Sequence, residues 1–158
     1  MSEFIKAATS EVKHFYETKV FGYYTTTSSA VYLPITGYTL EGTSNVGQNE
    51  RYGMIAPYNG TIEKIMWRSE ILHSGNIRMR IMEASDGTEI PGTEIGQFNI
   101  DTGSIADDVT VEVIAASHLT SSNVLTKGRL YGITVNSNQV AGSYDTNVTV
   151  VLKWDVTT

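Results

Sequence analysis

Apolar and polar residues alternate along much of the chain from residue 30 onward, the period-2 pattern of a β-strand with one buried face. Alternation is clearest in residues 147–156, where Val148, Val150, Leu152 and Trp154 fall on one side. The same pattern predicts strands at residues 31–33, 51–56, 61–70, 76–83, 95–100, 109–113 and 130–136. Residues 115–125 form the one stretch that suits a short helical turn. The pattern therefore predicts an antiparallel arrangement of about eight strands.

The apolar sides of these segments predict the core. We expect it to include Ile77, Met79, Ile81, Val109, Val111, Val113, Ile133, Val135, Val148, Val150, Leu152 and Trp154. Val, Ile and Thr make up 48 of the 158 residues, whereas Leu and Ala together supply 16. Because β-branched side chains lose rotamer freedom in a helix but pack well on a sheet, this composition favours strands. The prediction is an all-β protein, an antiparallel β-sandwich of jelly-roll-like type with an N-terminal extended arm.

The first 29 residues differ from the rest of the chain. Residues 10–21 follow neither a strand nor a helix period, and residues 25–29 are a polar run. We therefore divide the chain into an N-terminal arm, residues 1–29, and a β-sandwich domain, residues 30–158. The alternative, that the first 29 residues supply the first strands of the sandwich, carries about equal weight. A hairpin turn is expected at Asn59-Gly60, because both residue types tolerate positive φ angles.

The chain offers no recognisable catalytic or metal-binding motif. It has no Cys, and its three histidines, His14, His73 and His118, lack a second histidine or a carboxylate at ligand spacing. No G-x-S-x-G, Walker A or G-x-G-x-x-G pattern occurs. We therefore expect no enzyme activity, no catalytic residues, no metal and no cofactor. The net charge of −6 gives no general attraction to nucleic acid or to an anionic membrane, so neither is expected as a partner.

Two charged clusters allow a second interpretation. The acidic segments 83–89 and 101–108 could offer oxygen ligands to a hard cation, but solvated turns are the favoured interpretation. Arg68, Arg78 and Arg80 could face an acidic partner or could form the solvated side of a sheet. The solvated side is favoured, and the partner surface stays open as an alternative.

Four tyrosines fall within a stretch of sixteen residues. Tyr23, Tyr24, Tyr32 and Tyr38 could stack on a sugar, although core or interface packing is the favoured role.

No segment reaches the roughly 18 apolar residues of a membrane span, and the N-terminus shows no secretory signal. We therefore expect synthesis in a cytoplasm.

Several stretches resemble a recurring pattern in small structural proteins of tailed bacteriophages, particularly marine and cyanobacterial ones. The first is APYNG at residues 56–60, followed by a strand that ends in RSE at residues 68–70. The others are DGTEIPGT at residues 86–93 and KGRLYGITV at residues 127–135. The resemblance covers residues 31–156, and its motifs are turn and strand motifs rather than chemical signatures.

The resemblance implies a virion structural protein, most simply a capsid decoration (cement) protein that binds the major capsid protein lattice, or other virion proteins, and stabilises the head. A tail or fibre component with a carbohydrate- or receptor-binding role is the alternative. It also implies a homo-oligomer, most simply a trimer, assembled into the virion in the host cytoplasm. Because aromatic residues dominate interface hot spots, we expect the interface to include Phe4, Ile5, Phe15, Tyr16, Phe21, Tyr23 and Tyr24.

Overall fold

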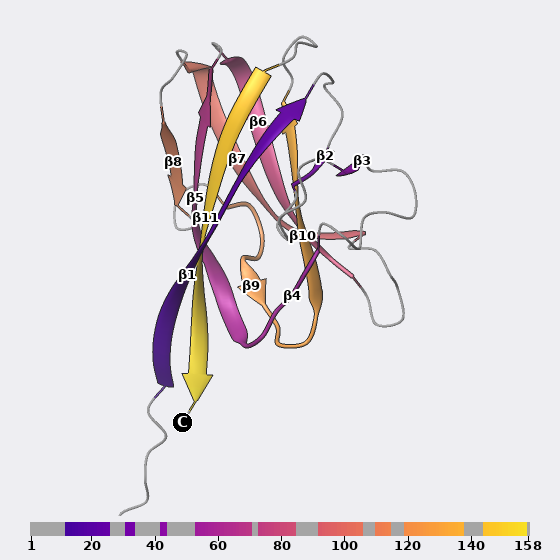
Figure 1. Ribbon diagram of the computed structural model, residues 1–158, viewed down its shortest axis with the longest axis vertical. Coiled ribbons are helices and arrows are strands. Elements are labelled where there is room, and N and C mark those ends of the chain that lie inside the picture. Colours follow the sequence, from indigo (N-terminus) through magenta and orange to yellow (C-terminus); the bar gives the residue numbers. More distant parts are fainter. Residues whose placement is uncertain are drawn as a thin grey trace, which may run out of the picture.

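The protein is a β-sandwich in which two antiparallel sheets pack face to face (Figure 1). The computed structural model describes residues 12–25, 31–33, 42–43, 53–70, 73–84, 92–105, 110–114, 119–137 and 144–157. None of these described residues is helical. The prediction of an all-β antiparallel sandwich is therefore confirmed.

Sheet A, as we name it, has five strands in its described part. Its main order is β1, β11, β5, β8, and β9 also pairs with β5. The strands span Val12–Thr25 (β1), Tyr144–Thr157 (β11), Asn59–Ser69 (β5), Val111–Ile114 (β8) and Val124–Leu125 (β9).

Sheet B has six strands in its described part, in the order β3, β2, β10, β6, β7, and β4 also pairs with β10. The strands span Gly42–Thr43 (β3), Val31–Tyr32 (β2), Leu130–Ser137 (β10), His73–Glu83 (β6), Thr93–Ile105 (β7) and Met54–Ile55 (β4). β6 and β7 are consecutive and pair along their length, with bulges at two points.

The strand order is that of a jelly roll. β3, β4 and β9 are set aside as two-residue strands, and β2, which has the same length, is kept because it pairs with β10 in the main order of sheet B. Eight strands remain, and numbering them in chain order gives sheets 1-8-3-6 and 2-7-4-5. This is the double Greek-key order of an eight-stranded jelly roll. Along the described strands, the chain passes from one sheet to the other between β1 and β2, β4 and β5, β5 and β6, β7 and β8, β9 and β10, and β10 and β11.

The core fills the space between the sheets. Eight of the predicted core residues are confirmed, each at most 4% exposed: Met79, Ile81, Ile133, Val135, Val148, Val150, Leu152 and Trp154. Val109 and the side chains of Ile77, Val111 and Val113 lie outside the described residues. The structure adds large buried side chains that the sequence analysis did not name: Leu33, Ile62, Ile65, Trp67, Phe98, Leu125 and Tyr131. Burying each such side chain contributes about 1.5–3 kcal/mol.

The expected hairpin at Asn59-Gly60 is wrong. Both residues are the first two of β5, neither has a positive φ, and β4 before them pairs with β10 in the other sheet. Gly60 is required for another reason: a Cβ there would lie 2.3 Å from the Lys153 carbonyl oxygen and 2.6 Å from the Trp154 ring. The Asn59 side chain instead accepts a hydrogen bond from the Lys127 backbone N–H at 2.9 Å.

The helical turn considered for residues 115–125 is also absent from its described part. Residues 119–125 contain a bridge to Phe98, a bend and β9. The turn that follows is built around Gly128, whose φ of 84° is the left-handed conformation that glycine adopts most easily. Arg129 N–H closes this turn on the Thr126 carbonyl at 3.1 Å.

The N-terminal region contributes a strand to the sandwich. Residues 12–25, which the sequence analysis placed in the arm, form β1 and pair with β11 over 14 residues. This matches the alternative in which the region supplies the first sandwich strand. Residues 1–11 and 26–29 lie outside the described residues, so an arm remains a prediction there.

Candidate functional site

Strand β1 forms one edge of sheet A in the described part of the chain, and it carries more of the exposed large apolar side chains than any other described strand. Its register with β11 runs from Val12 opposite Thr157 to Thr25 opposite Tyr144. Directly opposed residues of an antiparallel pair project to the same face. Three residues of β1 therefore lie on the inner face, because each is opposite a buried residue of β11. The pairs are Phe15 with Trp154, Glu17 with Leu152, and Lys19 with Val150.

The inner face of β1 is charged where a core position is ordinarily apolar. Lys19 Nζ lies 2.5 Å from Glu17 Oε1, and the Trp154 indole N–H donates to Glu17 Oε2 at 2.9 Å. Burial raises the pKa of Glu17, but the hydrogen bonds from Lys19 and Trp154 and the charge of Lys19 outweigh it, so the pKa is lowered. Glu17 is thus held as a carboxylate at the rim of the core.

The outer face of β1 is apolar where a solvated face is ordinarily polar. Tyr16 is 64% exposed and Val20 is 69% exposed, and Thr18 between them is exposed as well. His14 Nδ1 lies 2.6 Å from Asp155 Oδ1 on the same face. We call Tyr16, Thr18 and Val20 the outer stripe of β1.

Phe15, on the inner face of β1, contacts a second aromatic residue, Tyr58. The rings of Phe15 and Tyr58 meet edge to face, with centroids 5.7 Å apart and planes at 89°. Phe15 is 41% exposed and Tyr58 is 39% exposed, so this pair is packed only on one side. Half-exposed aromatic pairs of this kind are common anchors in protein interfaces.

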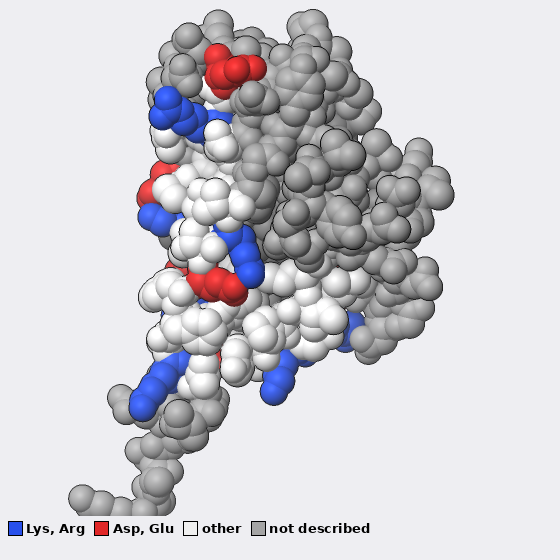
Figure 2. Space-filling view, viewed as in Figure 1, with Lys and Arg blue, Asp and Glu red and all other residues white. Residues whose placement is uncertain are grey.

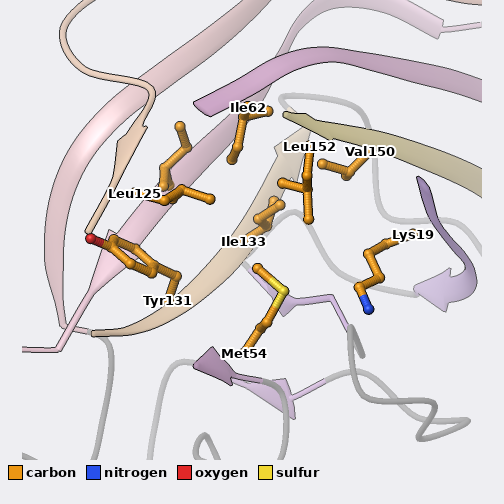
Figure 3. Close-up of a pocket in the computed structure, with 9 residues that line it drawn as sticks. Lys19, Met54, Ile62, Leu125, Tyr131, Ile133, Val150 and Leu152 are labelled. Carbon is orange, nitrogen blue, oxygen red and sulfur yellow. The ribbon is translucent and has the colours of Figure 1, made fainter. Parts of the chain in front are cut away.

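The gap between the two sheets contains a small apolar cavity (Figure 3). Lys19 lies at its margin, and the other lining residues are Met54, Ile62, Ile81, Leu125, Tyr131, Ile133, Val150 and Leu152. The room for the centre of a water-sized molecule is about 10 Å³, which is roughly one water. The cavity is therefore a packing gap and not a site for a cofactor-sized ligand.

Tyr131 carries a hydroxyl at the wall of this cavity. That hydroxyl accepts a hydrogen bond from the Thr126 backbone N–H at 2.8 Å. Burial raises the pKa of Tyr131, and nearby Glu83 raises it further, although the bond from Thr126 acts in the opposite direction. Tyr131 is therefore a structural hydroxyl that fixes the turn before β10.

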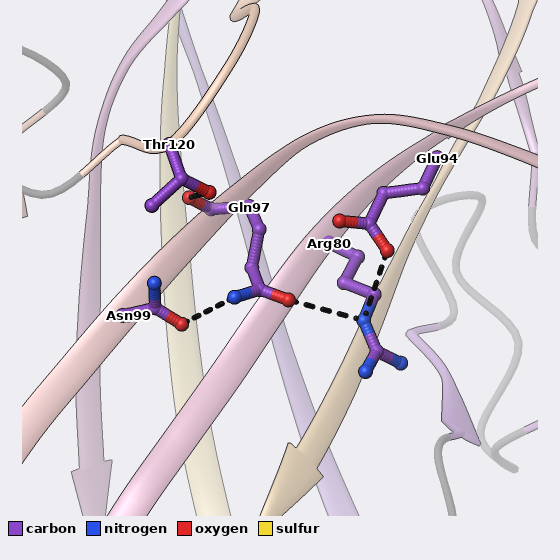
Figure 4. Close-up of polar contacts among 5 residues, drawn as sticks. All are labelled: Arg80, Glu94, Gln97, Asn99 and Thr120. Atoms are coloured by element: carbon purple, nitrogen blue, oxygen red, sulfur yellow. Dashed lines mark hydrogen bonds and ion pairs between the residues drawn. The ribbon is translucent and has the colours of Figure 1, made fainter.

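Arg80 on sheet B belongs to a cross-strand polar network (Figure 4). Arg80 Nε lies 3.2 Å from Glu94 Oε2 and 3.3 Å from Gln97 Oε1. Gln97 Nε2 donates to Asn99 Oδ1 at 2.5 Å, and the hydroxyl of Thr120 donates to the Gln97 carbonyl at 3.2 Å. Arg80 thus fits the solvated side of a sheet, the interpretation that the sequence favoured.

Charges of both signs are interspersed on the face that Figure 2 shows, and neither sign gathers into one patch among the described residues. A shallow groove of about 210 Å³ lies on sheet A, lined by Met66, Trp67, Arg68, Thr110, Asn147 and Thr149. Its one aromatic residue, Trp67, is 1% exposed, so this groove offers no ring for a sugar to stack on. Tyr32, considered above for stacking, is likewise 5% exposed.

The structure places two residues of the predicted interface on opposite faces of β1, Phe15 on the inner face and Tyr16 on the outer face. Phe15 and Tyr16 lie exposed on β1. Phe21, Tyr23 and Tyr24 belong to β1 by their backbone, but their side chains lie outside the described part, as do Phe4 and Ile5 altogether. The sequence analysis did not name Val20, Tyr58, Ile55 or Val124, which are also exposed. Solvent exposure of a strand depends on which strands flank it, and no local pattern encodes that.

The remaining candidate residues form no metal-binding cluster in the part of the chain that the structure describes. Within the described residues, no three His, Cys, Asp or Glu side chains are grouped closely enough to hold a metal ion. Asp101 and its neighbours up to Ile105 continue β7 instead of forming an acidic loop, and Glu83 lies 3.6 Å from Arg129. The His73 side chain, His118, Tyr38 and residues 85–89 and 106–108 lie outside the described part.

The described residues include no helix of the length and apolarity that a membrane crossing requires. Comparison with known proteins adds no relative: no protein-family model matches the chain, and no curated protein matches it.

Proposed function

We propose that the protein is a non-enzymatic structural component of a phage virion, a capsid decoration protein that binds the lattice of the major capsid protein and stabilises the head. The observation that carries the proposal is the exposed apolar stripe on an edge strand, with Tyr16 at 64% and Val20 at 69% exposed. The virion setting comes from the resemblance in residues 31–156.

Edge strands with exposed apolar residues are a hazard for a protein that acts alone. Soluble proteins usually blunt such edges with charge, proline or a covering segment. A decoration protein has a reason to keep one, because it functions by covering surface and its anchors are apolar side chains and main-chain groups. On β1 the outer stripe supplies such apolar anchors on the outer face of sheet A.

Binding to purified capsids tests the proposal. Val20→Asp places a charge in the outer stripe, and we expect it to lower the occupancy of capsids at least tenfold, because a docked carboxylate would lose its water. The matched control is Val124→Asp on β9, where the valine is also exposed, at 53%, but lies on another strand. We expect the control to bind like the wild-type protein.

Labelling of intact virions with an antibody locates the protein directly. Label over the head supports the decoration role, whereas label confined to the tail or fibres supports the alternative tail component. Absence from purified virions contradicts both roles. A tail module that recognises sugars would also bind a glycan array, and the decoration role predicts no such binding.

A further inference from the structure

Strand β1 is the long open edge of the described sandwich. In the described part of the chain it pairs with β11 alone, although it is 14 residues long. The other edges are short or covered: β8 has four residues and β3 has two. The free side of β7 is covered where the backbone N–H groups of Thr120 and Ser122 donate to the carbonyls of Gln97 and Ile95, at 2.9 and 3.0 Å.

The sequence of β1 is complementary to itself when read antiparallel about Thr18. In that register Thr18 lies opposite the same residue of a second copy, Glu17 lies opposite Lys19, and Tyr16 lies opposite Val20. The twofold axis repeats each pair. Opposite charges and aromatic–β-branched pairs are both favourable directly across an antiparallel ladder.

Neighbouring registers lack this match. A shift of the axis to residue 17 places Glu17 opposite Glu17, and a shift to residue 19 places Lys19 opposite Lys19. Like charges directly opposed are destabilising. Inward-facing charges usually protect an edge strand from pairing, and here Glu17 and Lys19 disfavour the two registers next to the one centred on Thr18.

We propose that two copies of the chain form a twofold-symmetric dimer by antiparallel pairing of their β1 strands about Thr18, so that sheet A continues from one copy into the other. The proposal rests on the proposed function in one respect, since it names the partner at the same assembly surface. Pairing over residues 12–24 would add about a dozen main-chain hydrogen bonds, one for each opposed pair on average.

The dimer also changes what the outer face presents to a capsid. Tyr16 of each copy lies beside Val20 of the other, so two separate stripes become one apolar surface across the axis. The ion pair between Glu17 and Lys19 within each copy gains a second pair across the interface. The resulting apolar surface is continuous and has the twofold symmetry of the β1–β1 interface.

A cysteine cross-link tests the register. The chain has no native Cys, so Thr18→Cys introduces one thiol per copy. Directly opposed Cα atoms in an antiparallel pair lie roughly 4.5–5.5 Å apart, which is within disulfide range. Mild oxidation should convert Thr18→Cys almost completely to a covalent dimer. Val20→Cys is the control, because its two thiols would be separated by four positions along the strands and should not cross-link.

Charge exchange tests the same register without covalent chemistry. Glu17→Lys opposes lysines, and Lys19→Glu opposes glutamates, so sedimentation of each variant alone should give a single chain of 17.3 kDa. An equal mixture of the two variants should restore a particle of twice that mass. The matched controls Lys64→Glu and Glu112→Lys reverse the same charges on an ion pair of β5 and β8, and each should remain a dimer alone. Circular dichroism checks that each variant is folded, which matters most for Glu17→Lys because Glu17 accepts the Trp154 indole N–H. Lys19→Glu keeps that acceptor, so its sedimentation alone tests the register.

The outcomes separate this proposal from the proposed function. A wild-type protein that sediments as a monomer at all concentrations, or as a trimer, overturns the dimer. A dimer that neither cross-links through Thr18→Cys nor responds to the charge variants overturns the register. A monomer that still decorates capsids leaves the proposed function standing, and a dimer that is absent from virions leaves the dimer standing while the proposed function fails.

Discussion

Glu17 lies on the side of β1 that faces the core, where its carboxylate accepts hydrogen bonds from Lys19 and from the indole of Trp154. Trp154 is fully buried, so its N–H requires a partner within the protein. Glu17 supplies that partner across the β1–β11 pair. Glu17 therefore has two roles: it accepts the buried Trp154 N–H, and it holds β1 against β11.

The first prediction concerns pH. Because the folded-state pKa of Glu17 lies below the ordinary value of 4.5, its carboxylate stabilises the fold fully above that value, and the stabilisation is lost as pH falls through the folded pKa. Glu17→Gln should therefore unfold more easily than wild type at pH 7, and the difference should shrink below pH 4.5. Urea unfolding at a series of pH values measures both free energies.

The control for this prediction removes a carboxylate elsewhere. Glu112→Gln breaks an exposed pair with Lys64 on sheet A, so its free energy of unfolding should stay within about 0.5 kcal/mol of wild type. A Glu17→Gln variant whose deficit persists unchanged into acid would contradict the role given to the Glu17 charge.

At the scale of the elements, β11 is the strand on which sheet A depends, because it pairs with β1 on one side and β5 on the other. Its alternation separates a buried side from a side toward solvent. Val150 is 1% exposed, whereas the next residue, Val151, is half-buried on the outer side.

The second prediction follows from this alternation. Val150→Asp should abolish soluble folded protein, because it places an unpaired charge in the core at a cost of several kcal/mol. Val151→Asp is the matched control one residue away, and it should remain soluble and folded. Soluble yield and thermal melting measure the difference, and equal melting temperatures would contradict the assignment of the two faces.

The central strands were predictable from sequence for a physical reason. Residues of β5, β6, β10 and β11 are flanked on both sides, so burial follows side-chain parity and leaves an alternating pattern. For β1 the sequence left an arm and a first sandwich strand open, because its inner positions Glu17 and Lys19 are charged whereas its outer positions Tyr16 and Val20 are not. This is the reverse of the pattern of a half-buried strand.

The turns were predicted less well than the strands. Residue types such as Asn-Gly indicate a turn locally, but they do not show which distant residues the segment contacts. Asn59-Gly60 has the residue types of a hairpin, yet the close approach of Trp154 explains the glycine, and the bond to Lys127 explains the asparagine. Both reasons come from residues far along the chain. The candidate site followed the same rule, since Tyr16 could be named as aromatic but not as lying on an edge.

At the scale of the molecule, the N-terminal region has two parts, a strand of sheet A at residues 12–25 and the preceding residues 1–11. Residues 12–25 are structural, because β1 covers β11 and supplies Glu17 to Trp154. Residues 1–11 precede every described strand, and the predicted anchors Phe4 and Ile5 fall among them.

The third prediction separates the two parts by truncation. Deletion of residues 1–11 should leave the melting temperature near that of the full chain, and it should lower capsid occupancy if Phe4 and Ile5 are anchors as we propose. Deletion of residues 1–25 should prevent soluble folding, because it removes a complete strand of sheet A. Thermal melting and capsid co-sedimentation measure the two effects. A stable fold after the longer deletion would contradict the structural role of β1.

The pairing of the first strand with the last also sets the order in which the chain can fold. His14 and Asp155, which contact each other, are 141 positions apart, whereas β6 and β7 are neighbours along the chain. On the ribosome the β6–β7 hairpin can therefore form early, while β1 waits until β11 has been synthesised and has left the exit tunnel. Long closures of this kind make folding slow, on a scale of milliseconds to seconds. During that wait β1 has an open edge on both sides, so a holding chaperone should raise the yield of native protein.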